Sequence, residues 1–244
     1  MASILITGSA DGLGQLAAKA LADQGHQVVL HARNAARARH AQQNVPGADR
    51  VLVGDLSDIE AAKGVAQQAN AWGRFDAVIH NAGVYQAPAK EIFAVNVIAP
   101  YILTCLIQRP RRLIYLSSSM HFQGRANLES FTRDVNRISY SDSKLYVVML
   151  CLAAARRWPD VCANAVDPGW VPTKMGGRGA PDDLQKGYET QTWLAVSEDS
   201  RAKVSGRYFH HMTERRPNPQ ASDVTLQERF LSVCRDITGI PFPQ

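Results

Sequence analysis

The sequence predicts a single α/β domain, residues 1–244, built on a doubly wound parallel sheet. Strand-like and helix-like segments alternate from the first residues onward, as in a chain of successive β-α-β units. The early strand-like runs are continuously apolar, which is typical of parallel strands buried on both faces. Right-handed crossovers then place helices on both faces and ligands at the carboxyl ends of the strands.

Each element has its own local pattern. The expected strands cover residues 3–7, 27–31, 50–53, 75–80, 112–116, 161–166 and 206–210. The expected helices cover residues 14–23, 34–43, 58–71, 90–107, 140–156 and 183–196, with one more beyond Pro219. Gly25 is placed to end the first helix, Ser57 or Asp58 to cap the third, and Pro100 to kink the fourth.

The composition is that of a soluble protein with a full core, because 45% of residues are apolar and 20% are charged. The net charge of +5 is spread out, apart from residues 33–39, so no nucleic-acid partner is expected. The four cysteines lack metal-ligand spacing and read as free thiols, so no metal is expected. No signal peptide and no run long enough to span a bilayer is visible, which favours a cytoplasmic location.

A glycine-rich loop, Thr-Gly-Ser-Ala-Asp-Gly-Leu-Gly, occupies residues 7–14 between the first strand and the first helix. Glycines let a backbone turn tightly and approach a pyrophosphate, and the helix start offers free N–H groups and a partial positive charge. A tight turn without a ligand is the alternative. The position of the loop predicts a dinucleotide site that includes Gly8, Ser9, Asp11, Gly12, Leu13 and Gly14.

The residues after the second and third strands bear on the choice of cofactor. Folds that prefer NAD usually place an acid after the second strand to bind the ribose 2′-hydroxyl, whereas this chain has Arg33. A guanidinium can pair with a 2′-phosphate, so NADP(H) is favoured over NAD(H). Arg37 and Arg39 are expected to lie on a solvated helix face. Asp55, followed by Leu56, suits either the adenine amino group or a helix cap.

Further along the chain, several motifs resemble those of the short-chain dehydrogenase/reductase family, which has a Rossmann-type fold. With the glycine loop, they follow one another in the family's order along essentially the whole chain. The motifs are Asn81-Ala82-Gly83, Asn96 in Val-Asn-Val, Ser118 in Leu-Ser-Ser, Tyr140-Ser-Asp-Ser-Lys144, and Pro168-Gly169-Trp-Val171-Pro-Thr173. The resemblance implies that Asn81, Ala82 and Gly83, and then Pro168, Gly169, Val171 and Thr173, contact the nicotinamide cofactor.

The spacing and chemistry of Tyr140 and Lys144 suit acid–base catalysis independently of the resemblance. The two residues lie one helical turn apart, so both side chains project from one face. A nearby ammonium stabilises a phenolate, so Lys144 is expected to lower the pKa of Tyr140 toward neutrality, where it acts well as a general acid or base. Ser118 would hydrogen-bond the substrate oxygen, although Ser117 and Ser119 compete for that role. By resemblance, Lys144 also holds the nicotinamide ribose and Asn96 anchors a proton-relaying water.

Three segments depart from the simplest members of the family. Between Ser118 and Tyr140 the chain has a longer insert with His121, which resembles the retinol-dehydrogenase-like subgroup; His121 is expected to be a pocket wall or surface residue. Residues 175–181 are glycine-rich and suit a mobile lid. The segments around the fourth helix are short. The family's usual homotetramer is therefore in doubt, and a homodimer or monomer is possible.

The expected function is hydride transfer between NADP(H) and a small carbonyl or alcohol substrate, with NADP(H) preference favouring reduction. A redox sensor that binds NADP without turnover is the alternative, although such proteins tend to lose the tyrosine or lysine that this chain keeps. An epimerase or dehydratase of nucleotide sugars would need a larger substrate-binding extension than the tail after Thr173 provides.

Overall fold

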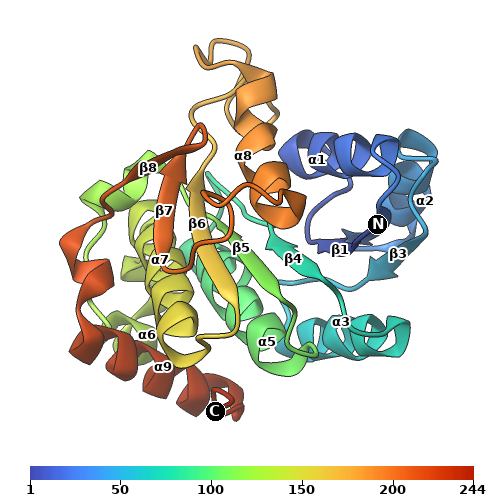
Figure 1. Ribbon diagram of the computed structural model, residues 1–244. Helices are drawn as coiled ribbons and strands as arrows, with labels where there is room; N and C mark the ends of the chain where they lie inside the picture. The colour runs from blue at the N-terminus through green and yellow to red at the C-terminus, as the bar shows by residue number, and fades with distance from the viewer.

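Eight strands form one sheet in the order β3-β2-β1-β4-β5-β6-β7-β8 in the computed structural model, which describes residues 1–244 (Figure 1). The strands are Ser3–Ile6, Gln27–Ala32, Arg50–Val53, Ala77–His80, Arg112–Leu116, Cys162–Asp167, Arg207–His210 and Thr213–Arg215. The first seven pair in parallel, and β8 pairs antiparallel with β7. The doubly wound α/β fold is therefore confirmed, and its strand order reverses between β1 and β4, where such sheets open a ligand crevice.

The helices begin and end near the expected residues. The α-helices α1 to α9 are Gly12–Asp23, Ala35–Asn44, Ile59–Trp72, Ala89–Phe93, Ala99–Leu106, Ser130–Arg133, Tyr140–Arg157, Leu184–Val196 and Val224–Thr238. Asp58 caps α3, which decides between the two expected caps. Gly25 adopts a φ of +80° just after α1, where a left-handed residue ends a helix readily.

The structure corrects the sequence reading in three places. The expected helix 90–107 is two α-helices joined by a π-helical turn, Ala94–Ile98, so the irregularity precedes Pro100. The insert after Ser118 holds short helical turns, Ser119–Gln123, Ser130–Arg133 and Val135–Arg137, which are too brief to show periodicity. Strand β8 was missed because its three residues are all exposed.

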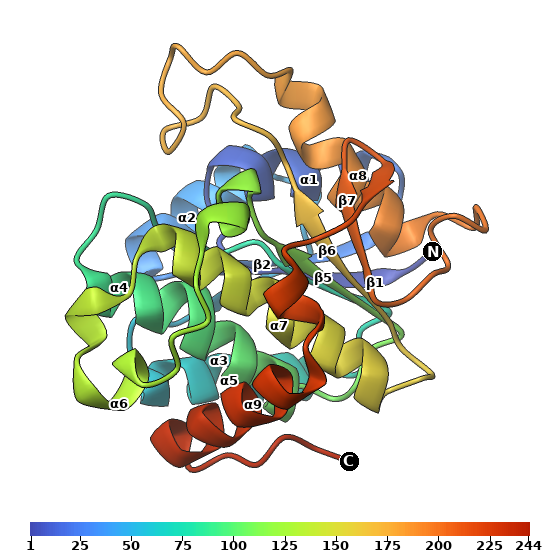
Figure 2. The ribbon, with the colours of Figure 1, turned by 90° about the vertical axis from the view of Figure 1, so that its left-hand side faces the viewer.

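Two apolar clusters cover the two faces of the sheet. Helices α3, α5, α7 and α9 pack below it, and α1, α2 and α8 above it, as Figure 2 shows. Strands β1, β2, β4 and β5 are buried along nearly their whole length, which explains their continuous apolar runs. The segment between β6 and α8 extends away from the body of the domain (Figures 1 and 2).

One stretch corrects the reading that no segment could span a bilayer. Residues Ala89–Leu106 are long and apolar enough by composition, but 72% of that stretch is buried inside the domain, as in a core helix. The four cysteines are free thiols, as expected, with Cys151 and Cys234 fully buried.

Candidate active site

A long cavity of about 380 Å³ lies at the carboxyl ends of the central strands. Many of the expected cofactor and catalytic residues line it: Gly8, Asp11, Gly12, Leu13, Arg33, Asp55, Leu56, Asn81, Ala82, Gly83, Tyr140, Lys144, Pro168 and Thr173. Its two ends are therefore the region after β2 and β3 and the region around the start of α7. Six expected residues are not part of the lining: Ser9, Gly14, Asn96, Ser118, Gly169 and Val171.

The glycine loop is built for close approach of backbone to a ligand. A side chain on Gly8, which has a φ of +63°, would come within 2.8 Å of Ala82 Cα. The Asn81 side chain donates to the carbonyls of Thr7 and Gly8 at 2.9 and 3.2 Å, which ties the loop to the end of β4. The sequence-predicted loop therefore forms as a fixed turn at the sheet edge.

The start of α1 differs from those of the other long helices. A side chain caps each of α2, α3, α7, α8 and α9, through Asn34, Asp58, Ser139, Asp183 and Asp223. Asp11 precedes α1 but makes no capping hydrogen bond. The N–H groups of the first turn of α1 thus lack a side-chain partner and, with the helix dipole, suit an anion such as a pyrophosphate.

Ser9 and Gly14 support the loop from behind, which differs from the expected contact with the cofactor. The Ser9 hydroxyl donates to Ile6 O at 2.8 Å and accepts from His31 N at 2.9 Å, and the residue is fully buried. A side chain on Gly14 would come within 2.4 Å of Asn81 Nδ2. Both residues hold the loop against β2 and β4.

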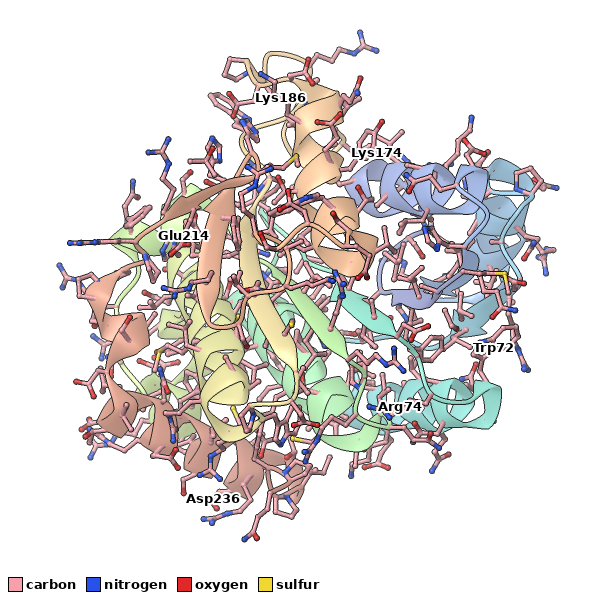
Figure 3. The ribbon with its side chains drawn as sticks, in the orientation of Figure 1. Trp72, Arg74, Lys174, Lys186, Glu214 and Asp236 are labelled. Carbon is pink, nitrogen blue, oxygen red and sulfur yellow. The ribbon has the colours of Figure 1, made fainter.

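Four charged residues, Asp11, Arg33, Arg37 and Lys174, line the outer part of the cavity. Arg33 is exposed and unpaired there, whereas Arg37 is paired with Asp11 at 2.5 Å. The expectation of a solvated face is thus wrong for Arg37, which lines the cavity, but Arg39 is exposed as expected. Lys174 reaches the same Asp11 carboxylate at 3.2 Å, and Figure 3 shows Lys174 near α1.

The charge of Asp11 is held in place by its neighbours. Burial acts to raise the pKa of Asp11, but hydrogen bonds from Arg37 and Lys174 outweigh it and lower the pKa. Asp11 therefore stays a carboxylate, and it joins the glycine loop to the segment after β6.

Asp55 and His31 line the outer end of the long cavity. The Asp55 carboxylate accepts from the N–H and hydroxyl of Ser57 at 2.9 and 2.8 Å, so it forms a local turn and not the helix cap. His31, which sequence reasoning missed, links Gly8 N to Gly54 O through its two ring nitrogens, at 3.1 and 2.9 Å. Nothing in an apolar strand signals such a bridge, because it depends on loops 23 residues away in either direction.

Helix α7 brings the two expected catalytic residues to the inner end of the cavity. Ser139 and Asp142 form a capping box that starts the helix at Tyr140. Lys144, one turn on, is only 4% exposed and donates from Nζ to Leu116 O at 2.9 Å. Burial lowers the pKa of Lys144 to about 8, partly opposed by Asp167.

The pKa of Tyr140 differs from the sequence expectation. Burial raises it, with Asp167 and Tyr85 adding to the rise, while the neighbouring Ser118 hydroxyl opposes it. The Lys144 ammonium lies 5.5 Å from the centre of the Tyr140 ring and is occupied by Leu116 O. Tyr140 is therefore held as a protonated phenol near neutral pH.

Asn96 is buried within the π-helical turn, beside the cavity. Its Oδ1 accepts from Val84 N at 2.8 Å, and its Nδ2 donates to Val84 O at 3.1 Å and Ser143 Oγ at 3.0 Å. A side chain on Gly83 would lie 3.4 Å from Asn96 Oδ1 and 3.2 Å from Lys144 Nζ. Asn96 thus positions the loop after β4, and only a lone pair of Oδ1 is left for a water.

The three serines after β5 have different surroundings. The Ser117 hydroxyl is committed to Lys144 O at 3.0 Å. Ser118 Oγ accepts from Met120 N at 3.2 Å and lies beside Tyr140. Ser119 faces a second cavity. Among the three, Ser118 is the hydroxyl placed to share a substrate oxygen with Tyr140.

His121 is neither a pocket wall nor a surface residue, which corrects the expectation. It is fully buried, with Nδ1 2.7 Å from Ser118 O and Nε2 3.1 Å from Asn218 N. A neutral ring that donates from Nδ1 and accepts at Nε2 satisfies both contacts, and burial lowers the His121 pKa. The ring therefore fixes the turn that carries Ser118.

The segment after β6 covers the inner end only in part. Pro168 and Thr173 line the long cavity, while Gly169 donates to Asp167 Oδ1 at 3.0 Å and Val171 is buried. Residues 175–181 form turns and exposed coil.

Comparison with known proteins places this site in a family. The short chain dehydrogenase family matches residues 2–183 of the sequence. The chain belongs to this family. An uncharacterized oxidoreductase of Emericella nidulans is 45% identical over 256 residues, covering 100% of this chain and 99% of the relative. A short-chain dehydrogenase of Penicillium rubens is 40% identical over 258 residues, covering 100% of both chains.

Within the short-chain dehydrogenases, more distant relatives and solved structures share the fold. Mouse retinol dehydrogenase 13 is 26% identical, covering 98% of this chain and 84% of its own. An uncharacterized protein from Mycobacterium paratuberculosis has a TM-score of 0.85 at 22% identity, covering 100% of this chain and 96% of its own. A short chain dehydrogenase from Shigella flexneri, solved with NADP, has a TM-score of 0.67 at 25% identity, covering 86% and 97%.

Proposed function

We propose that this short-chain dehydrogenase is an NADP(H)-dependent oxidoreductase that acts on a small carbonyl or alcohol substrate in the cytoplasm. The supporting observation is that one cavity joins an uncapped helix start and a free Arg33 to Tyr140 and Lys144. A phosphate-rich ligand fits the outer end, and proton-transfer chemistry fits the inner end.

The residues present fit a nicotinamide dinucleotide. The glycine loop and the start of α1 would hold the pyrophosphate, and Arg33 the 2′-phosphate. The Lys144 ammonium would hold the nicotinamide ribose, and Asp55 the adenine amino group. When bound, the cofactor supplies the hydride.

Side chains of the protein would supply the proton and stabilise the charge that develops on the substrate oxygen. Because the pKa of Tyr140 is raised, its hydroxyl carries a proton at neutral pH and can give it to the substrate oxygen as that oxygen becomes an alkoxide. The Ser118 hydroxyl would donate a hydrogen bond to the same oxygen. Asn96 and His121 act as positioning residues, since they hold the loops of Gly83 and Ser118. This arrangement favours the reductive direction.

A titration with NADPH and, separately, with NADH tests the cofactor assignment through nicotinamide fluorescence. We expect tighter binding of NADPH, and we expect Arg33→Ala to weaken NADPH binding by about tenfold or more while changing NADH binding little, because only NADPH has the 2′-phosphate. Arg39→Ala, on the exposed face of α2, is the matched control. Equal losses for both cofactors in Arg33→Ala would contradict the role of Arg33.

A further inference from the structure

A second cavity, of about 410 Å³, lies at the carboxyl ends of β6 and β7. Neighbouring residues of the chain line the two cavities: Ser117 and Pro168 line the long cavity, and Ser119 and Gly169 line the second. Lys174, which lines the long cavity, lies near α1 in Figure 3, where Glu214 marks strand β8. A substrate whose oxygen reaches Ser118 and Tyr140 could therefore extend into the second cavity.

The β7–β8 pairing sets which side chains face this cavity. Tyr208 lies opposite Arg215 in the antiparallel register, so both point to the same face of the sheet. His210 follows two residues after Tyr208 and shares that face, and all three line the cavity. Arg207 and Glu214 alternate onto the other face, where they pair at 3.3 Å.

The floor of the cavity holds a polar atom with no partner. The Tyr208 residue is 1% exposed, and its hydroxyl, which lies near the Asp167 carboxylate, forms no well-aligned hydrogen bond within the protein. His210 Nδ1 is likewise buried without a hydrogen bond, 3.2 Å from Asp167 Oδ2 in poor geometry. Since buried polar groups are nearly always satisfied, a ligand oxygen beside Tyr208 would complete the hydrogen bonding of its hydroxyl.

Two exposed aromatic rings form walls that are held in place. Trp170 is 60% exposed, yet its backbone N–H donates to Asp182 Oδ2 at 2.5 Å and its indole donates to Gly176 O at 2.8 Å. Phe122 is 51% exposed and packs on His121 with ring centres 4.1 Å apart. Exposed aromatic surface beside a cavity suits a flat, unsaturated ligand.

Two aspartates and two arginines line the cavity, and the two arginines form no ion pair within the protein. The carboxylates of Asp167 and Asp182 accept hydrogen bonds from the backbone N–H groups of Gly169 and Trp170. Arg215 and Arg216 are exposed and line the cavity, whereas the guanidinium used in an ion pair nearby is that of Arg207, on the opposite face. An anionic group is thus the natural partner for this pair of arginines.

We propose that the second cavity binds the body of the substrate, and that the substrate is an aromatic carbonyl compound with a carboxylate substituent. The ring lies between Phe122 and Trp170, the carboxylate pairs with Arg215 and Arg216, and the Tyr208 hydroxyl donates to a ligand oxygen. The assignment of this ligand as the substrate rests on the proposed reductase function.

Binding of 3-acetylbenzoate and of acetophenone, without cofactor, tests the anionic preference through quenching of tryptophan fluorescence. We expect 3-acetylbenzoate to bind at least about tenfold more tightly, because acetophenone lacks the carboxylate. The double variant Arg215→Gln/Arg216→Gln should abolish this difference, while Arg207→Gln should keep it. Equal affinities in the unaltered protein, or a difference that survives in the double variant, would overturn the proposal.

A second variant tests the floor. Tyr208→Phe should weaken 3-acetylbenzoate binding about threefold or more without lowering the melting temperature, because its hydroxyl has no partner in the protein. A lowered melting temperature with unchanged binding would show that the hydroxyl serves the fold and not a ligand.

Oxidation of NADPH in the presence of 3-acetylbenzoate then separates the two proposals. Binding without turnover would contradict reduction of this compound while leaving the anionic aromatic site standing. Turnover of acetophenone and 3-acetylbenzoate with equal kcat/KM would support the reductase and overturn the anionic site.

Discussion

The two ends of the long cavity use charge in opposite ways. At the outer end, the side chains of Asp11 and Arg37 are 36% and 34% exposed, and Lys174 is 80% exposed. At the inner end, Lys144 and Asn96 are 4% and 1% exposed. The outer charges are screened by water and exchange partners cheaply, whereas each inner polar group is held by specific hydrogen bonds.

The extent of burial therefore has different consequences at the two ends of the cavity. The outer end can accept a highly charged ligand because its charged groups remain partly exposed and Arg33 forms no ion pair within the protein. At the inner end, desolvation lowers the pKa of Lys144 and raises that of Tyr140. Substitutions at the inner end should therefore change catalysis, and those at the outer end should change ligand binding.

The largest effect is expected from Tyr140→Phe, which removes the proton donor but keeps the ring. We expect kcat for ketone reduction to fall by about 10²–10⁴-fold with NADPH affinity nearly unchanged. Steady-state kinetics and NADPH titration measure the two quantities. Tyr85→Phe, whose ring packs edge-on to Tyr140 with centres 4.7 Å apart, is the control. Unchanged turnover in Tyr140→Phe would remove Tyr140 from the mechanism, and absence of turnover in the unaltered protein would favour a redox sensor.

An intermediate effect is expected from pH. Because the pKa of Lys144 is about 8, its ammonium is lost above that pH, and we expect kcat/KM to fall up to about tenfold per pH unit. Tyr140, with its raised pKa, stays protonated in this pH range and does not cause the alkaline fall of kcat/KM. Any residual activity of Lys144→Arg should not show this fall above pH 8, since a guanidinium stays charged.

The pH dependence of the free energy of unfolding distinguishes the fall of kcat/KM above pH 8 from a loss of the folded state. Between pH 8 and 10.5 the unfolded chain keeps the Lys144 proton that the folded chain has lost, so this group makes the free energy of unfolding rise with pH. Denaturant unfolding at several pH values measures it. If kcat/KM falls at the same pH at which the protein unfolds, the fall is not caused by the titration of Lys144.

The smallest effect is expected at the outer end, from Asp11→Asn. Removal of a carboxylate from the phosphate end should tighten NADPH binding by about two- to threefold, and loss of exposed ion pairs should change the free energy of unfolding by less than about 1 kcal/mol. Asp23→Asn, at the other end of α1, is the control. An effect as large as that of Tyr140→Phe would contradict the contrast between the two ends.

The sequence alone determined the alternation of elements, the doubly wound sheet, the glycine loop and the placement of Tyr140 and Lys144 one turn apart. These features are local, since they depend on periodicity, caps and spacing within single elements. Tertiary structure alone decided that Arg37 turns to Asp11, that His121 is buried behind Ser118, and that burial is the main cause of the raised pKa of Tyr140. It also brought Phe122, Trp170 and Arg215 around one cavity. Desolvation and long-range contacts depend on how distant segments pack, and no short stretch of sequence contains that information.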